Sequence, residues 1–346
     1  MIISSPDLTA PRSVLADWIE ITALLRERAA GAGDLDSLYR LNSDDDRRRR
    51  HLDDGVAEEE IVELAREELS SRVGEEIEFR ARALGELYPF TVVSNPFRVT
   101  VRREANSTAH SAYLFMLLMS ANHYGFLPAN REIRASIDFG RRLFHICASI
   151  GVAGLLRRGK TYWFGFPRPD KSNFANALAD LSTKIGYAKA FAPAPAGLPV
   201  AAKDDQVDVI GWRAYGDRRI GTMVVVCQAA TGDDWDSKSV QHHLQAFLDW
   251  FERVPYRQAM GSLAVPFPGH HEVDEPVGDT FETALSNALS RLNSRHGVVL
   301  DRLRITESIP ALVGEGNGWE DVAGHAEVRT LQEWIDRITP QLHAAA

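Results

Sequence analysis

Apolar residues recur at helical spacing through the first part of the chain. Beginning after Ser13, whose side chain suits an N-cap, Val14, Trp18, Ile21 and Leu25 would form one apolar helix face. The same pattern continues with helices and an alternating segment that suits a strand. It predicts helices at 13–25, 57–73, 107–123 and 130–155, and a further helix that ends at 88–89. Strands are predicted at 97–102 and 161–166. Residues 1–166 are therefore expected to be mostly helical.

The second part of the chain alternates between helical and strand patterns. Phe174, Leu178, Leu181 and Ile185 fall on one face of a predicted helix. The run TMVVVCQ at 222–228 is apolar throughout, which is typical of a central strand. The predicted order is helix 173–187, strands 207–213 and 222–228, helix 240–251, strand 260–265, helix 281–292, strand 298–303 and helix 331–342.

A short segment rich in proline and charge, PRPDK at 167–171, separates these two regions and reads as a linker. A length of 346 residues also fits two domains better than one. The sequence thus predicts a mostly helical domain at 1–166 and a second domain at 167–346.

Composition limits which partners and which cellular compartment the protein is expected to have. The formal net charge of −9 means that any contact with nucleic acid must come from a local patch. The two cysteines, Cys147 and Cys227, provide neither a disulfide framework nor a cysteine-based zinc site, which favours a reducing cytoplasm. The N-terminal residues do not resemble a signal peptide. The most apolar run, 112–121, is shorter than the about 20 residues that span a membrane.

Basic residues in the first region are the candidates for contact with a nucleic-acid backbone. They are Arg141, Arg142, Arg157, Arg158 and Lys160. The alternative is that these side chains simply solvate a helix surface. The run DDDRRRR at 44–50 has the same two interpretations, a phosphate-binding arginine cluster or a solvated segment.

The strongest chemical signal is the pair of strands between Val207 and Lys238. Asp208, in QVDVIGW, lies at the start of the first strand, and Gln228, in VVVCQAA, lies at the end of the second. Together with the order helix, strand hairpin, helix, strand from residue 173 onward, these positions resemble the PD-(D/E)XK nuclease fold in a degenerate form.

The resemblance implies a metal site. In that family an Asp begins one strand, and an acid or Gln, then a Lys two residues later, lie on the next. Asp208 and Gln228 match the first two positions, but Ala230 stands where the family has Lys, and Lys238 is the nearest replacement. The implied site holds Mg²⁺ or Mn²⁺ through Asp208, Gln228 and the backbone carbonyl of Ala229, while Lys238 stabilises charge on the phosphate.

A second carboxylate would strengthen metal binding, and the family often supplies one from the preceding helix. Asp180 is that candidate here, although it lies away from the apolar face of its helix. The alternatives are Asp204, Asp205, Asp233 and Asp234. A purely structural interpretation also stands, in which Asp208 caps a turn and Gln228 satisfies backbone groups.

The expected fold class is mixed α/β, with a helical N-terminal region and a C-terminal restriction-endonuclease-like domain built on a central mixed sheet. The resemblance implies a Mg²⁺-dependent DNA endonuclease of a bacterial restriction or anti-phage defence system, working with a partner protein. The alternative, motivated by Gln228 and Ala230, is a catalytically inactive nuclease-fold subunit that binds DNA or scaffolds a complex. A third possibility is a nucleic-acid-binding regulator that acts through the N-terminal half.

Overall fold

The structure is a computed structural model. It describes residues 3–40, 57–102, 107–186, 188–192, 203–214, 217, 222–232, 234–238, 240–253, 259–268, 280–314 and 318–345.

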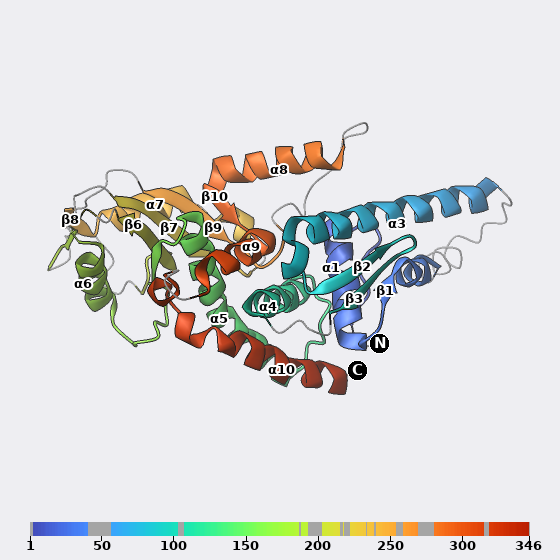
Figure 1. The fold of residues 1–346 in the computed structure, drawn as a ribbon, viewed down its shortest axis with the longest axis horizontal. Helices are drawn as coiled ribbons and strands as arrows, with labels where there is room; N and C mark the ends of the chain where they lie inside the picture. Colours follow the sequence, from blue (N-terminus) through green and yellow to red (C-terminus); the bar gives the residue numbers. More distant parts are fainter. Residues whose placement is uncertain are drawn as a thin grey trace.

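The helices and strands carry the labels of Figure 1. The α-helices are α1 (Arg12–Arg26), α3 (Ala57–Leu84), α4 (Thr108–His123), α5 (Arg131–Leu155), α6 (Phe174–Ile185), α7 (Val240–Leu248), α8 (Phe281–His296), α9 (Arg302–Leu312) and α10 (Arg329–Ala344). Residues 32–40 are also helical. The strands are β1 (Ala30–Gly31), β2 (Phe90–Ser94), β3 (Phe97–Val101), β4 (Lys160–Trp163), β5 (Lys189–Ala190), β6 (Val209–Ala214), β7 (Thr222–Ala229), β8 (Phe251–Arg253), β9 (Met260–Ala264) and β10 (Val298–Leu300). Short 3₁₀ helices are η1 (Gly85–Leu87), η2 (Trp235–Ser237), η3 (Trp319–Asp321) and η4 (His325–Glu327).

A five-stranded mixed sheet forms the centre of the second region. Its strand order is β10-β9-β7-β6-β4. β10, β9 and β7 run parallel, whereas β6 is antiparallel to both of its neighbours. β7 lies in the middle of the sheet, where both faces of a strand are covered, as its continuous apolar run predicts.

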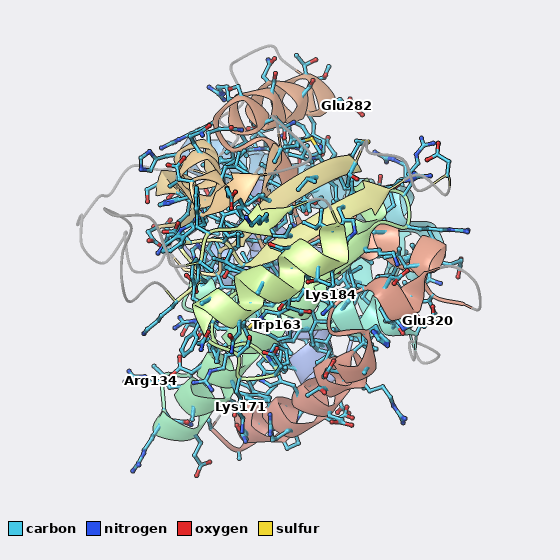
Figure 2. All side chains as sticks on the ribbon, turned by 90° about the vertical axis from the view of Figure 1, so that its left-hand side faces the viewer. Arg134, Trp163, Lys171, Lys184, Glu282 and Glu320 are labelled. Carbon is cyan, nitrogen blue, oxygen red and sulfur yellow. The ribbon has the colours of Figure 1, made fainter. Side chains whose placement is uncertain are left out.

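Helices cover both faces of this sheet. α5 contacts β4, β6 and β7 on one face, and the close approach requires glycine, since a Cβ on Gly211 would lie 2.2 Å from Val152. On the other face, α6 and α7 bury side chains such as Leu181 and Phe247 against Ile210 and Val226. Figure 2 views the molecule from this second side, with α6 in front of the sheet.

The small antiparallel sheet β1-β3-β2 packs with α1 and α3 in the N-terminal region. The end of the chain returns to this region, because α9 and α10 pack against α4 and α5. The indole N–H of Trp334 donates to the carbonyl of Ser136 (2.8 Å), and Nε2 of His343 lies 2.6 Å from the carbonyl oxygen of Leu25. The N- and C-termini consequently lie near one another in Figure 1.

The predicted boundary at 166/167 does not coincide with a gap in the packing. β4 precedes it in the chain, yet β4 is paired with β6 in the five-stranded sheet. One hydrophobic core extends from Ile3 to Leu342. A domain division at this position would therefore separate β4 from its sheet.

The mixed α/β class with a helical N-terminal region and a central mixed sheet is confirmed. Several element boundaries differ from the prediction. The segments predicted as two helices before Tyr88 form one long α3, which ends at Leu84. The predicted strand 298–303 stops at Leu300, because Asp301 caps a helix by accepting the N–H of Arg304 (3.0 Å). The strands β2 and β8 and the helix α9 were not predicted.

None of the helices in the described parts of the chain combines the length and apolar character that crossing a membrane requires.

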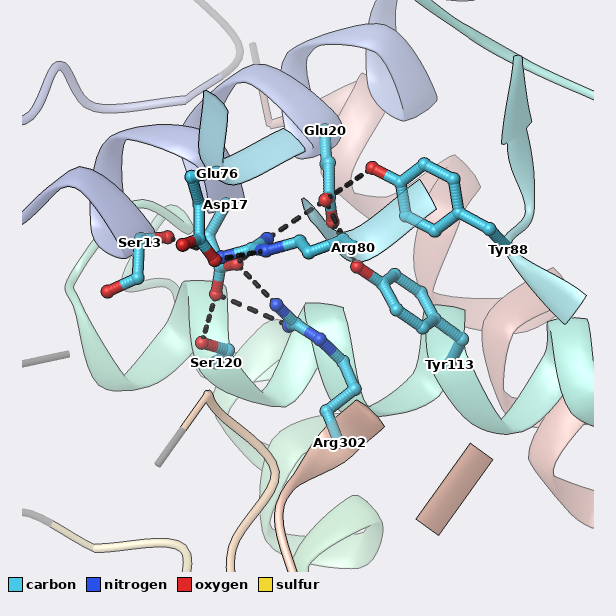
Figure 3. A network of polar contacts seen from close by, with 9 residues as sticks. All are labelled: Ser13, Asp17, Glu20, Glu76, Arg80, Tyr88, Tyr113, Ser120 and Arg302. Atoms are coloured by element: carbon cyan, nitrogen blue, oxygen red, sulfur yellow. Dashed lines mark hydrogen bonds and ion pairs between the residues drawn. The ribbon is translucent and has the colours of Figure 1, made fainter. Parts of the chain in front are cut away.

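A buried charge network joins the helices of the N-terminal region (Figure 3). Its charged members are Asp17 and Glu20 of α1, Glu76 and Arg80 of α3, and Arg302 of α9, all with fully buried side chains. Arg80 donates to Asp17 (2.6 Å), Glu20 (2.9 Å) and Glu76 (2.7 Å). Arg302 donates to both carboxylate oxygens of Asp17. The network thereby ties three helices together.

Hydroxyl groups complete this network. Ser120 of α4 donates to Asp17 (2.5 Å), while Tyr88 (2.7 Å) and Tyr113 (2.9 Å) donate to Glu20. Burial, reinforced by the charge of Glu20, raises the pKa of both tyrosines, so their hydroxyls remain protonated and able to donate. Burial opposes ionisation of Asp17, but the nearby arginines outweigh it and lower the pKa of this carboxyl.

Candidate functional site

Asp208 lies just before β6, at the edge of the sheet where β7 ends. Its backbone carbonyl accepts the N–H groups of Phe164 and Gly165, both at 2.8 Å, which fixes the position of the residue. Among the described residues, its carboxylate has two hydrogen-bond partners. Oδ1 lies 3.0 Å from Nε2 of His145, and Oδ2 accepts the N–H of Ala229 at 2.8 Å.

His145 reaches Asp208 from α5, on the face of the sheet that this helix covers. The imidazole stacks on Trp163, with ring centroids 5.0 Å apart and an interplanar angle of 14°. Its Nδ1 lies 3.0 Å from the carbonyl oxygen of Arg142. Both ring nitrogens therefore face groups that only accept hydrogen bonds, and only the imidazolium form donates to both.

The electrostatic environment agrees with a protonated ring. Burial of His145 disfavours its charged form, but the hydrogen bond and the negative charge of Asp208, with smaller contributions from Arg142 and Asp204, outweigh burial. The pKa of His145 is consequently raised above its ordinary value. Asp208 and His145 thus form a partly buried ion pair, with side chains 19% and 12% exposed.

Gly165 closes the space around this pair. A Cβ at this position would lie 2.5 Å from Nε2 of His145 and 2.6 Å from Oδ1 of Asp208. The carbonyl of Gly165 also accepts the indole N–H of Trp163 at 3.1 Å. A residue with a side chain would push the ion pair apart.

Gln228 lies at the backbone position next to Asp208, but its side chain belongs to the other face of the sheet. Side chains alternate along a strand, and Gln228 follows Val224 and Val226, which pack with α6 and α7. Asp208 instead contacts His145 on the α5 face. The side chain of Gln228 is 4% exposed, and its Oε1 has no hydrogen-bond partner among the described residues.

The structure does not bring Lys238 or Asp180 to Asp208. The amine of Lys238 forms an ion pair with Asp234 at 3.1 Å. Asp180 pairs with Lys184 at 2.6 Å. The role predicted for each as part of a shared site with Asp208 therefore has no contact that supports it.

Two of the alternative acids lie closer to Asp208 in the chain, and each has its own partners. Asp204 accepts the N–H groups of Phe166 and Gln206, both at 3.1 Å. Asp205 accepts the indole N–H of Trp250 at 2.8 Å. Asp233 lies outside the described residues.

The donor set does not fit the implied Mg²⁺ or Mn²⁺ site. Within the described parts of the chain, no group of three or more His, Cys, Asp or Glu side chains is arranged to hold a metal ion. Asp208 is the single carboxylate of the proposed ligand set, and the imidazole of His145 and the N–H of Ala229 already engage it. The amide of Gln228 points to the opposite face of the sheet.

The candidate nucleic-acid-binding residues fall into two groups along α5. Arg141 and Arg142 are exposed near its middle, and Arg141 pairs with Asp138 at 3.2 Å. Arg157 and Arg158 are exposed just after its end, about 24 Å away along the helix axis. The fifth candidate, Lys160, forms an ion pair with Asp321 at 3.0 Å. The arginine run at 47–50 lies outside the described residues.

Sequence reasoning did not identify His145 or Trp163 as part of this site. His145 is separated from Asp208 by 63 positions, and it interrupts a helix face that otherwise reads as apolar core. A histidine between Phe144 and Ile146 was the one local signal, and nothing in the sequence linked it to Asp208.

Comparison of the chain with protein-family models, with curated proteins and with solved structures finds no match.

Proposed function

We propose that this chain is a DNA-binding subunit with a nuclease-like fold, and that Asp208 has a structural role rather than a metal-binding one. The resemblance that motivates the nuclease-like fold also suggests the setting, a bacterial restriction or anti-phage defence complex. The order α6, β6, β7, α7, β9 supports this part of the proposal, because it matches the helix, hairpin, helix, strand order of the resemblance.

The observation that carries the proposal is the engagement of Asp208. A carboxylate that holds Mg²⁺ offers its oxygens to the ion, whereas both oxygens of Asp208 accept hydrogen bonds from the protein. The imidazole of His145 lies 3.0 Å from Oδ1 of this carboxylate, so a metal ion would have to displace the ring before it could bind that oxygen.

The DNA-binding part of the proposal rests on Arg141 and Arg142. Both are exposed on α5, one helical turn before His145. Because the chain carries a net charge of −9, binding must rely on local contacts such as these and must weaken as salt concentration rises.

Two measurements test the proposal together. The first is incubation of supercoiled plasmid with the purified full chain and Mg²⁺ or Mn²⁺, beside Asp208→Asn; we expect no nicking by either protein. The second is fluorescence anisotropy of a labelled duplex at several salt concentrations. We expect the double variant Arg141→Glu, Arg142→Glu to weaken binding and to lower the salt slope by about 2. Arg291→Glu, an exposed arginine on α8, is the matched control and should bind as the wild type does.

A Mg²⁺-dependent DNA endonuclease is the second candidate. It rests on the order α6, β6, β7, α7, β9, which the first proposal shares. Nicking by the wild type that is lost in Asp208→Asn would replace the first proposal with this one. A duplex that fails to bind even at low salt would contradict the DNA-binding role.

A further inference from the structure

A cleft of about 570 Å³ lies beside the free edge of the five-stranded sheet. We call it the edge cleft; β4, α6 and the segment 320–327 line it. Its volume is within the range of about 300–1,000 Å³ that is usual for ligand sites. In Figure 2 this part of the molecule faces the viewer, with Trp163, Lys184 and Glu320 labelled around it.

The backbone of β4 turns one edge toward this cleft, where segment 320–327 contacts it through the N–H of Ala323, which donates to Oγ1 of Thr161 at 2.8 Å. The N–H of Phe164 donates to the carbonyl of Asp208, and paired positions alternate along an antiparallel strand. The N–H and C=O groups of Thr161 and Trp163 consequently point away from β6. In the described part of the chain no strand pairs with this edge of β4. An extended peptide can add a strand at such an edge.

Aromatic side chains give the edge cleft an apolar surface. Tyr162 and Trp212 are 8% and 4% exposed, and Trp163 is half-buried beside them. Aromatic faces with nearby carboxylates suit cationic groups.

Carboxylates outnumber cations in the edge cleft. Asp180 and Asp321 are already paired with Lys184 and Lys160. Three further carboxylates line the cleft without an ion pair to any described residue. They are Asp170, Glu320 and Glu327. A ligand that carries positive charge is therefore favoured, and the phosphates of nucleic acid are repelled.

We propose that the edge cleft binds an extended basic segment of a partner protein, which pairs with β4 as an additional strand. The backbone groups of Thr161 and Trp163 that point away from β6 supply the pairing, and the carboxylates without an ion pair to a described residue select Arg or Lys side chains. This interaction does not rest on the function proposed above, and it uses none of the residues assigned there to DNA.

The probe for this proposal is a capped, fluorescein-labelled heptapeptide in which Arg alternates with Val. Anisotropy with the full chain should show saturable binding that weakens with salt. The double variant Glu320→Gln, Glu327→Gln should weaken binding about tenfold, because two partly solvated ion pairs are lost. Glu282→Gln, an exposed acid on α8, is the matched control and should leave binding unchanged.

Two matched peptides separate charge selection from strand pairing. A peptide with Glu in place of each Arg should not bind. A peptide that is N-methylated at alternate residues keeps its charges but cannot donate along one edge, so it should bind at least about tenfold more weakly. The proposal is overturned if the Arg peptide does not bind, or if the Glu peptide binds equally well. It is also overturned if the double variant Glu320→Gln, Glu327→Gln binds the Arg peptide as tightly as the wild type does. Equal binding of the N-methylated peptide would overturn pairing with β4. The duplex-binding assay tests the DNA-binding role separately, so a failure of one proposal is distinguished from a failure of the other.

Discussion

Replacement of Asp17 by Asn changes one charge at the centre of the buried charge network without changing the size of the side chain. Asp17 is the carboxylate that accepts from Arg302, and it also accepts from Arg80 and Ser120. Arg80 retains Glu20 and Glu76 in the variant. Arg302 retains no carboxylate within hydrogen-bonding distance among the described residues.

Removing one partner of a buried ion pair costs about 3–5 kcal/mol, because the other charge stays buried without compensation. Protein stabilities are about 5–15 kcal/mol, so Asp17→Asn should lose a large fraction of the free energy of unfolding. The lowered pKa of Asp17 adds a pH signature. Its stabilising contribution is present above the unfolded-state pKa of about 3.9 and is lost as pH falls through the lower folded-state value.

Urea unfolding at pH 7, followed by far-UV circular dichroism, measures the effect. Asp138→Asn is the matched control, because Asp138 is 67% exposed and its pair with Arg141 should contribute about 1 kcal/mol or less. The double variant Asp17→Asn, Arg302→Met also removes the unpaired charge. Its decrease in the free energy of unfolding should therefore be smaller than the sum of the decreases in the two single variants. A loss below about 1 kcal/mol in Asp17→Asn would refute the reasoning.

Three further changes test other parts of the structure. Because the pKa of His145 is raised in the folded state, its interaction with Asp208 contributes to the free energy of unfolding. This contribution is fully present below the unfolded-state pKa of about 6.5 and is lost as pH rises through the folded-state value. Urea unfolding of the wild type between pH 5.5 and 8.5 should show the loss, and His145→Gln should not. Gly165→Ala should destabilise the protein by about 1–3 kcal/mol, and an NMR titration should show the pKa of His145 returning toward its ordinary value; an unchanged titration would mean that the methyl group does not separate His145 from Asp208. Trp334→Ala should cost about 3–5 kcal/mol in urea unfolding, because its ring is fully buried and its N–H donates to Ser136; a loss below about 1 kcal/mol would show that α10 contributes little to the core.

Elements with a clear period could be predicted from the sequence. The TMVVVCQ run forms β7, and the face defined by Leu178, Leu181 and Ile185 is buried in α6. Here local pattern and tertiary burial agree. The strand hairpin that contains Asp208 and Gln228 was predicted for the same reason.

Other elements contain local signals that oppose the final structure. The segment that forms α9 includes Ile305 and Thr306, which favour strands, and Pro310, which disfavours a helix interior. Tertiary packing of α9 against α4 and α5 overrides these preferences. The cap at Asp301 was the available signal for a helix start.

The buried charge network and the candidate site both depend on contacts between residues far apart in the chain, which hydrophobic periodicity does not encode. α1 is buried nearly all round, so Asp17 and Glu20 occupy positions that a helical wheel assigns to solvent. The partner of Asp208 is likewise far away in the chain. The residue types and strand positions of Asp208 and Gln228 led to the prediction of a metal site. Their side chains lie on opposite faces of the sheet, and only the three-dimensional structure shows this.

The distance in sequence between Asp17 and Arg302 has a consequence for the order in which the chain can fold during synthesis. At about 5–20 residues per second, a ribosome needs roughly 15–60 s to add the 285 residues between them. During that time Asp17 and Glu20 share the guanidinium of Arg80 without the second arginine of the network. We expect the N-terminal helices to remain loosely packed on the ribosome, and accessible to proteases and chaperones, until α9 emerges and Arg302 supplies the missing charge.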